Sequence, residues 1–150
     1  MIWNALEQVW AQARASNIEL VHEFEVEDAW MLGDGNLLER TLINLLTNAI
    51  KYSPASTTVR VRLVREEDRF VCCVIDEGYG IQAADLPTLF DRFSRVANKM
   101  HGDVTGAGLG LAFVEAVTVR HGGRVDVQST PGKGSSFCIT LSASPQPAAR

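Results

Sequence analysis

Four polar side chains between Leu37 and Pro54 have the types and spacing to bind a ligand. They are Asn44, Asn48, Lys51 and Tyr52. At about 100° of rotation per residue they share one stripe of a helix, beside a second stripe made of leucines. Two carboxamides, an ammonium group and a phenol in front of leucines indicate a polar ligand held against this helix. A solvated amphipathic face is the alternative, although lysine or glutamate would serve such a face better than asparagine, a poor helix former.

Two turns of the chain are rich in glycine. The first follows Asp76, at the end of an apolar run, and contains Gly78 and Gly80. The second precedes a predicted helix, and its glycines are Gly106, Gly108 and Gly110. Glycine lets a ligand approach the backbone, and a helix start offers free N–H groups that suit phosphate. Neither turn is specific by itself, because GAGLG is not the GxGxxG fingerprint and PGKGSS is not a Walker A loop.

Helical and alternating periodicities predict the elements that hold these residues. The central helix is capped by Asp34 or Asn36, with Glu39 placed as in a capping box, and Pro54 ends it. Alternation predicts strands at 18–27, 56–67, 124–130 and 135–142, and the continuous apolar run 70–76 predicts a buried strand that forms a hairpin with 56–67.

An N-terminal helix is predicted by apolar residues at helical spacing and ends near 16–17. The apolar residues are Trp3, Leu6, Trp10 and Ala13. Packing of this stripe in the core is favoured over a partner surface, although two tryptophans near a chain end could also face a neighbouring segment.

Composition excludes several classes of protein. The chain has 150 residues, 46% of them hydrophobic, and a formal net charge of −4. These values describe one globular domain without the basic excess that a nucleic-acid binder needs. No apolar run is long enough to cross a bilayer, and no signal peptide opens the chain. The cysteines are Cys72, Cys73 and Cys138; their odd number and lack of a CxxC pair favour reduced core residues of a cytosolic protein over metal ligands.

Five motifs occur in a fixed order along the chain. They are NLLTNAIKYS, DEGYG, LFDRFSR, GAGLGLA and GKGSSF. Together they resemble the N, G1, F, G2 and G3 boxes of the catalytic ATP-binding domain of sensor histidine kinases, a member of the superfamily that also contains DNA gyrase, mismatch-repair ATPases and heat-shock chaperones. The resemblance covers most of the chain, from about residue 18 to residue 141.

The resemblance implies an α/β (α+β) two-layer sandwich, the Bergerat ATP-binding fold. A mixed sheet is covered on one face by three helices, and a flexible lid closes over ATP. The implied layout is an N-terminal helix of the same domain at 1–17, the ATP-binding domain at 18–142 and a disordered tail at 143–150.

The resemblance also implies a role for each motif residue near the base and the metal. Asn48 would coordinate Mg²⁺, and Asn44 and Lys51 would contact the phosphates and act in transfer. Tyr52 would lie beside the nucleoside. The remaining roles concern the base: Asp76 would accept a hydrogen bond from the adenine amine, the backbone at Gly78 and Gly80 would close over the ring, and Ile81 would pack on it.

The lid residues are implied in the same way. Phe90 and Phe93 match the F box and would pack the base of the lid. Arg92 or Arg95 would reach the γ-phosphate, with Arg95 favoured as the catalytic residue. Four residues would form the end of the lid and the phosphate-facing helix start: Gly106, Gly108, Leu109 and Gly110. Ala107 departs from the usual threonine or serine, but the backbone donors that bind phosphate remain.

The function implied is phosphoryl transfer within a two-component system. ATP would be the donor, and the acceptor would be a histidine on a dimerisation domain outside this chain, because His22 stands inside a predicted strand. The parent would be a homodimer that passes the phosphoryl group to a response regulator. This domain would be cytoplasmic, without membrane contact, while the parent could be membrane-anchored. Alternatives are a stand-alone ATPase, an anti-sigma-type serine kinase and a degenerate nucleotide-binding module; Asn44 disfavours the ATPase, because it occupies the place of that enzyme's general-base glutamate.

Overall fold

The computed structural model describes residues 1–26, 31–92 and 110–143. Its sheet contains the strands β1 (Glu19–Phe24), β2 (Thr58–Glu66), β3 (Arg69–Asp76), β4 (Arg124–Thr130) and β5 (Gly134–Ser142). The strand order is β1-β2-β3-β5-β4, with β1 parallel to β2 and the other neighbours antiparallel. The predicted mixed sheet and both predicted hairpin strands are therefore confirmed.

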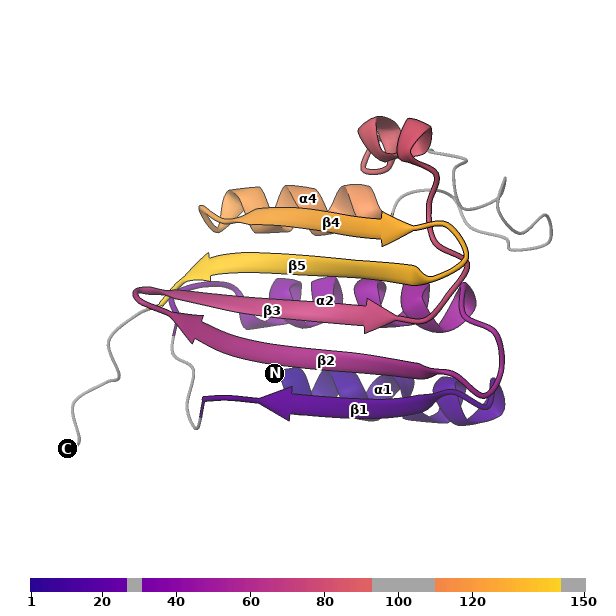
Figure 1. Ribbon diagram of the computed structural model, residues 1–150. Helices are drawn as coiled ribbons and strands as arrows, with labels where there is room; N and C mark the ends of the chain where they lie inside the picture. Colours follow the sequence, from indigo (N-terminus) through magenta and orange to yellow (C-terminus); the bar gives the residue numbers. More distant parts are fainter. Residues whose placement is uncertain (27–30, 93–109, 144–150) are drawn as a thin grey trace.

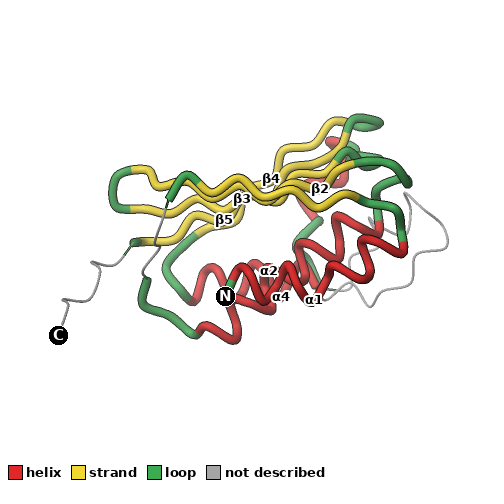
Figure 2. The backbone as a smooth tube through the Cα atoms, turned by 90° about the horizontal axis from the view of Figure 1, so that it is seen from below, coloured by secondary structure: helices red, strands yellow, loops and turns green. Residues whose placement is uncertain are grey.

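The helices α1 (Ile2–Ala15), α2 (Gly35–Lys51) and α4 (Gly110–Arg120) all cover the same face of this sheet (Figure 2). Figure 1 looks onto the face of the sheet that the helices do not cover, so the sheet lies in front of the helices, with β1 at one edge and β4 at the other. The strands alternate accordingly: Val59, Val61 and Leu63 of β2 are buried, and the arginines between them are exposed. The predicted two-layer fold is confirmed. None of the described helices combines the length and apolarity needed to cross a membrane.

The central helix α2 is the best-predicted element. The Asp34 side chain caps it by accepting hydrogen bonds from the N–H groups of Asn36 and Leu37, at 3.0 and 3.1 Å. The expected capping box is wrong, because the Glu39 carboxylate instead accepts from the Gln8 side chain of α1. The apolar stripe of α2 forms the centre of the core, with Leu45 and Leu46 almost fully buried.

The prediction that the tryptophans of α1 pack in the core is wrong. Trp3 and Trp10 are 57% and 55% exposed, and the residues that α1 buries are Ala5, Val9 and Ala13. The small side chains let α1 approach α2 closely. The larger aromatic rings are left along the rim of the layer.

A short helical segment lies between β3 and α4. Residues 83–88 form a 3₁₀ helix, η1 (Ala83–Thr88), with Pro87 inside it. Short 3₁₀ helices accommodate such a proline, whereas an α-helix would lose a hydrogen bond. The tail expected at 143–150 lies outside the described residues except for Ala143, whose N–H donates to the carbonyl of Asp68.

The cysteine prediction is wrong for two of the three residues. Cys73 and Cys138 are opposite one another on β3 and β5, and they form a disulfide. Both belong to the strand positions that face away from the helices. Cys72 points to the helix side as a free thiol, and its burial raises its pKa to about 12. The sequence could not reveal the pairing, because it does not say which strands are neighbours.

Candidate functional site

Asp76 ends β3 as a buried carboxylate, only 8% exposed. Its Oδ1 accepts hydrogen bonds from the N–H groups of Gly78 and Ser135, at 2.9 and 3.1 Å. Burial raises the pKa of Asp76, and these two hydrogen bonds act in the opposite direction. Both hydrogen bonds within the described part of the chain go to Oδ1. Oδ2 is therefore left to accept from a ligand.

The turn after Asp76 packs directly against the end of α2. The Tyr79 N–H donates to the Tyr52 carbonyl at 3.1 Å. A Cβ atom on Gly78 would lie 2.3 Å from that same carbonyl oxygen, so only glycine permits this approach. The carboxylate at the end of β3 and the polar end of α2 are thus held as one unit.

The turn between β4 and β5 packs against the segment that follows Asp76. The Gly132 N–H donates to the Tyr79 carbonyl at 2.7 Å, and the Ile81 N–H donates to the Ser129 hydroxyl, also at 2.7 Å. Gly80 has φ +74°, and a Cβ there would be 2.2 Å from the Thr130 carbonyl oxygen. These contacts fix the segment that carries Ile81.

A small cavity of about 30 Å³ lies where these segments meet, and we call it the Asp76 cavity. Its lining combines a few polar groups with apolar side chains: Asn48, Tyr52, Asp76, Tyr79, Gly80, Ile81, Leu89, Leu111, Ser135 and Phe137. Phe90 packs against one of these lining residues, with its ring centroid 6.2 Å from that of Phe137. A single carboxylate oxygen among apolar groups suits a flat ligand that donates one or two hydrogen bonds.

The structure gathers part of the predicted polar stripe of α2 at this cavity. Asn48 and Tyr52 line it, and burial raises the pKa of the Tyr52 phenol. Asn44 is half-buried one turn earlier on the same helix and does not line the cavity. Lys51 is exposed at the end of α2. These two predicted residues are therefore not part of the cavity lining.

Several predicted residues of the lid cannot be placed. Phe93, Arg95, Gly106, Gly108 and Leu109 lie outside the described residues. Of the others, Arg92 is exposed and Gly110 is the exposed first residue of α4. Gly110 directly precedes Leu111, which does line the cavity.

Sequence reasoning missed Ser135 and Phe137 as site residues. Both lie on β5, which pairs with β3 and brings Ser135 opposite Asp76. The adjacent Gly134, at φ +119°, was the available indication, because a Cβ there would be 2.1 Å from the Asp76 carbonyl oxygen. The resemblance implies that Gly132 and Gly134 shape a turn near the adenine pocket, but it does not identify the β5 side chains that follow this turn.

Comparisons with known proteins identify the family of the chain. Residues 33–145 match the family model described as "Histidine kinase-, DNA gyrase B-, and HSP90-like ATPase". The chain is 38% identical over 148 residues to the circadian input-output histidine kinase CikA of Thermosynechococcus vestitus, covering 96% of this chain and 20% of that protein. It is 36% identical over 142 residues to the sensor protein KdpD of Clostridium acetobutylicum, covering 91% of this chain and 16% of that protein. The chain thus spans about a fifth or less of the length of these relatives.

Solved structures show the same fold. A mycobacterial sensor histidine kinase, MprB, is 28% identical with a TM-score of 0.78, covering 97% of this chain and 96% of that one. Full-length ShkA, solved in complex with AMPPNP, is 26% identical with a TM-score of 0.83, covering 97% of this chain and 30% of that one. Sequence motifs, sheet topology and the site around Asp76 point the same way, and the chain belongs to the family of histidine kinase-, DNA gyrase B- and HSP90-like ATPases.

Proposed function

We propose that this chain is the ATP-binding catalytic domain of a sensor histidine kinase, and that adenine binds at the Asp76 cavity. The observation that carries the proposal is the carboxylate fixed through Oδ1, with Oδ2 left for a ligand. The adenine amine donates, so an ionised carboxylate suits it. Guanine presents a carbonyl at that position, which would place acceptor against acceptor.

The remaining lining fits a purine ring. Ile81, Leu89 and Phe137 are buried apolar side chains, and Tyr52 lines the cavity from the end of α2. A volume of about 30 Å³ holds roughly one water molecule, so a purine must displace the surrounding side chains. We expect Tyr79 to move most readily among them, because it is 37% exposed.

Asn48 is the proposed protein ligand of Mg²⁺. It lies on α2 one helical turn before Tyr52, so a nucleotide with its base at Asp76 would lead its phosphates along this helix. Within residues 1–26, 31–92 and 110–143, no group of three His, Cys, Asp or Glu side chains could hold a metal ion. A single carboxamide suffices for Mg²⁺ when phosphate oxygens and water complete its octahedron.

The triphosphate would extend from Asn48 toward residues outside the cavity. Asn44 and Lys51 are proposed to contact it from α2. Arg92 or Arg95 would stabilise the charge that develops during transfer, with Arg95 favoured. The backbone of the glycine-rich turn would supply N–H donors, and its residues are Gly106, Gly108, Leu109 and Gly110.

The proposed reaction transfers the γ-phosphoryl group of ATP to a histidine on a dimerisation domain outside this chain. From there an aspartate of a response regulator would receive it. Two relatives that are several times longer, one named as a histidine kinase and the other as a sensor protein, support this assignment, as does the ShkA structure solved with AMPPNP. Asn44 has no basicity to activate a water molecule, so we expect the isolated chain to hydrolyse ATP very slowly.

The adenine role is tested by Asp76→Asn. The two backbone N–H groups would hold the amide oxygen at the Oδ1 position, so the amide nitrogen would face the adenine amine, donor against donor. We expect AMPPNP affinity in calorimetry to fall at least about tenfold and the preference for adenine over guanine nucleotides to narrow. The matched control is Glu77→Gln, which removes the neighbouring charge but keeps the acceptor for the Thr58 N–H. Unchanged affinity in Asp76→Asn would overturn the adenine role.

The metal and transfer roles are tested by Asn48→Ala. We expect the variant to lose the magnesium dependence of AMPPNP binding and the phosphorylation of a separately supplied histidine-bearing dimerisation domain. Asn4→Ala, an exposed asparagine on α1, controls for the substitution itself. Rapid steady ATP turnover by the unmodified chain would favour a stand-alone ATPase instead, and phosphorylation of an added serine substrate would favour a serine kinase.

A further inference from the structure

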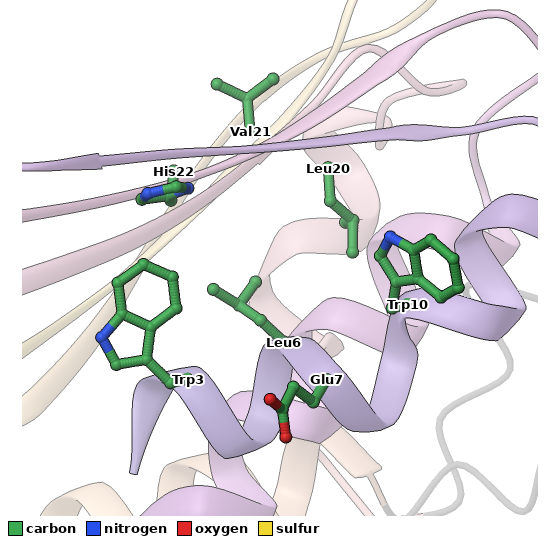
Figure 3. Close-up of a pocket in the computed structure, with 7 residues that line it drawn as sticks. All are labelled: Trp3, Leu6, Glu7, Trp10, Leu20, Val21 and His22. Atoms are coloured by element: carbon green, nitrogen blue, oxygen red, sulfur yellow. The ribbon is translucent and has the colours of Figure 1, made fainter.

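A second hollow of the molecule lies far from Asp76, between α1 and the edge strand β1. Figure 3 shows it: Trp3, Leu6 and Trp10 rise from the helix toward Leu20 and His22 on the strand. We call it the Trp groove; its volume is about 310 Å³, and Glu7 and Val21 complete its lining. Both tryptophans are more than half exposed, although each ring presents a large apolar surface.

Aromatic contacts hold one end of the Trp groove in place. The Trp3 ring lies edge-on to the rings of His22 and Phe24, with centroids 4.8 and 5.2 Å apart. At the other end the Arg14 guanidinium lies over the Trp10 ring, 5.1 Å from its centroid. The tryptophans are therefore positioned by neighbours while their outer surfaces face solvent. Exposed apolar surface that is held in place in this way is typical of recognition sites.

The backbone of β1 indicates that an extended polypeptide would fit beside the Trp groove. In the described part of the sheet β1 is an outermost strand, paired only with β2 (Figure 1). The N–H groups of Glu19 and Glu25 donate toward β2, to Thr57 and Leu63. Since a parallel strand directs alternate residues to alternate sides, the N–H and C=O groups of the even-numbered residues point outward. These residues are Leu20, His22 and Phe24, whose side chains also lie on the helix side of the sheet.

The other face of β1 carries three glutamates, Glu19, Glu23 and Glu25. Glu23 and Glu25 are paired with Arg60 and Arg62 of β2, each at 3.2 Å. In the described residues the carboxylate of Glu19, on the same face, has no cationic partner within ion-pair distance. A second copy of this chain, paired antiparallel through β1, would bring glutamates against glutamates, which is unfavourable across strands. The charge pattern therefore favours a different strand, with basic residues on this face.

We propose that the open edge of β1 binds an extended segment of a partner polypeptide in which apolar residues alternate with lysine or arginine. The segment would add a strand to the sheet through the outward backbone groups of Leu20, His22 and Phe24. Its apolar side chains would enter the Trp groove between Trp3 and Trp10. Its basic side chains would reach Glu19 on the opposite face. The proposal does not depend on the role of Asp76.

The probe is a soluble, end-capped peptide of alternating valine and lysine, as long as β1. It is added to the full chain, labelled with ¹⁵N, and followed by NMR. We expect chemical-shift changes at the amides of 19–24 and at the indole N–H groups of Trp3 and Trp10, with slower hydrogen exchange at Leu20 and His22. A valine–glutamate peptide and a peptide with the same composition but its lysines grouped should bind at least about tenfold more weakly.

Two variants separate the groove from general charge attraction. The double variant Trp3→Ser with Trp10→Ser should bind the valine–lysine peptide at least about tenfold more weakly than the unmodified chain. Glu19→Lys should bind it several-fold more weakly. Val119→Ser is the matched control, because Val119 is an exposed apolar residue of α4, 62% exposed. Retained AMPPNP affinity checks that each variant is folded. Equal binding of the valine–glutamate peptide, no binding at millimolar peptide, shifts centred elsewhere, or dimerisation of the chain through β1 would overturn the proposal.

Discussion

The Asp76 cavity and the Trp groove contrast in how their parts are arranged. Around Asp76, backbone approaches backbone so closely that glycine is required, and backbone N–H groups hold one oxygen of the carboxylate. Along the Trp groove, the exposed tryptophan rings belong to a helix whose buried residues are alanines and a valine. The outward backbone groups of β1 pair with no other strand of the described sheet. The specificity of the Asp76 cavity for its ligand therefore depends on close packing within the chain. The Trp groove instead presents an exposed surface to another molecule.

The largest effect should come from breaking the close fit around Asp76. Gly134→Ala places a Cβ atom 2.1 Å from the Asp76 carbonyl oxygen, at a residue whose φ is +119°. We expect a loss of about 3 kcal/mol in the free energy of unfolding, measured by urea denaturation. Gly35→Ala is the control, because it has open space and an ordinary helical backbone, and it should change stability by less than about 1 kcal/mol. A small loss in Gly134→Ala would mean that the turn is not packed as described.

A second comparison sets two residues of α1 against each other. Val9→Ala should cost about 2 kcal/mol, because Val9 is 2% exposed and its methyl groups leave a cavity. Trp10→Ala should cost about 1 kcal/mol or less despite removing a far larger side chain, since 55% of Trp10 is exposed. Urea denaturation of both variants gives the order. A reversed order would place Trp10 in the core and remove the basis of the Trp groove.

A third prediction concerns pH and nucleotide binding. Burial raises the pKa of Asp76 in the folded chain above its value in the unfolded chain. Between the unfolded and the folded pKa, the free energy of unfolding therefore decreases as the pH rises. Nucleotide binding has the opposite dependence, because only the ionised carboxylate can accept a hydrogen bond from adenine. We expect AMPPNP affinity to fall as pH decreases through the raised pKa, about tenfold for each further pH unit, or about 1.4 kcal/mol. Calorimetry over a pH series measures it, and Asp76→Asn should show no such step.

The contrast also shows what a sequence can and cannot predict. Capping by Asp34 and the leucine periodicity of α2 are local, so the central helix was predicted closely. Asp76 was recognised because a carboxylate before GYG is a motif of neighbouring residues. The partnership of Asp76 with Ser135 was missed because it depends on β5 lying between β3 and β4. No periodicity within one strand reports that order.

The same limit explains the errors on α1 and on the cysteines. The predicted stripe of Trp3, Leu6, Trp10 and Ala13 is apolar and helical, but periodicity does not say which of its members the fold will bury, and Ala13 is the member that belongs to the buried face. The narrow contact with α2 selected the face of Ala5, Val9 and Ala13. Cys73 and Cys138 are far apart in sequence and became neighbours only through strand pairing.

The bond between Cys73 and Cys138 closes a ring of chain with a sequence separation of 65 residues. Everything from Val74 to Phe137 belongs to that ring, including η1, α4 and β4. A protease that cuts once inside the ring would therefore leave two pieces joined covalently. The two pieces would separate on a denaturing gel only after a thiol reductant is added. Before reduction, the mass of the cut protein would exceed that of the intact protein by one water molecule only.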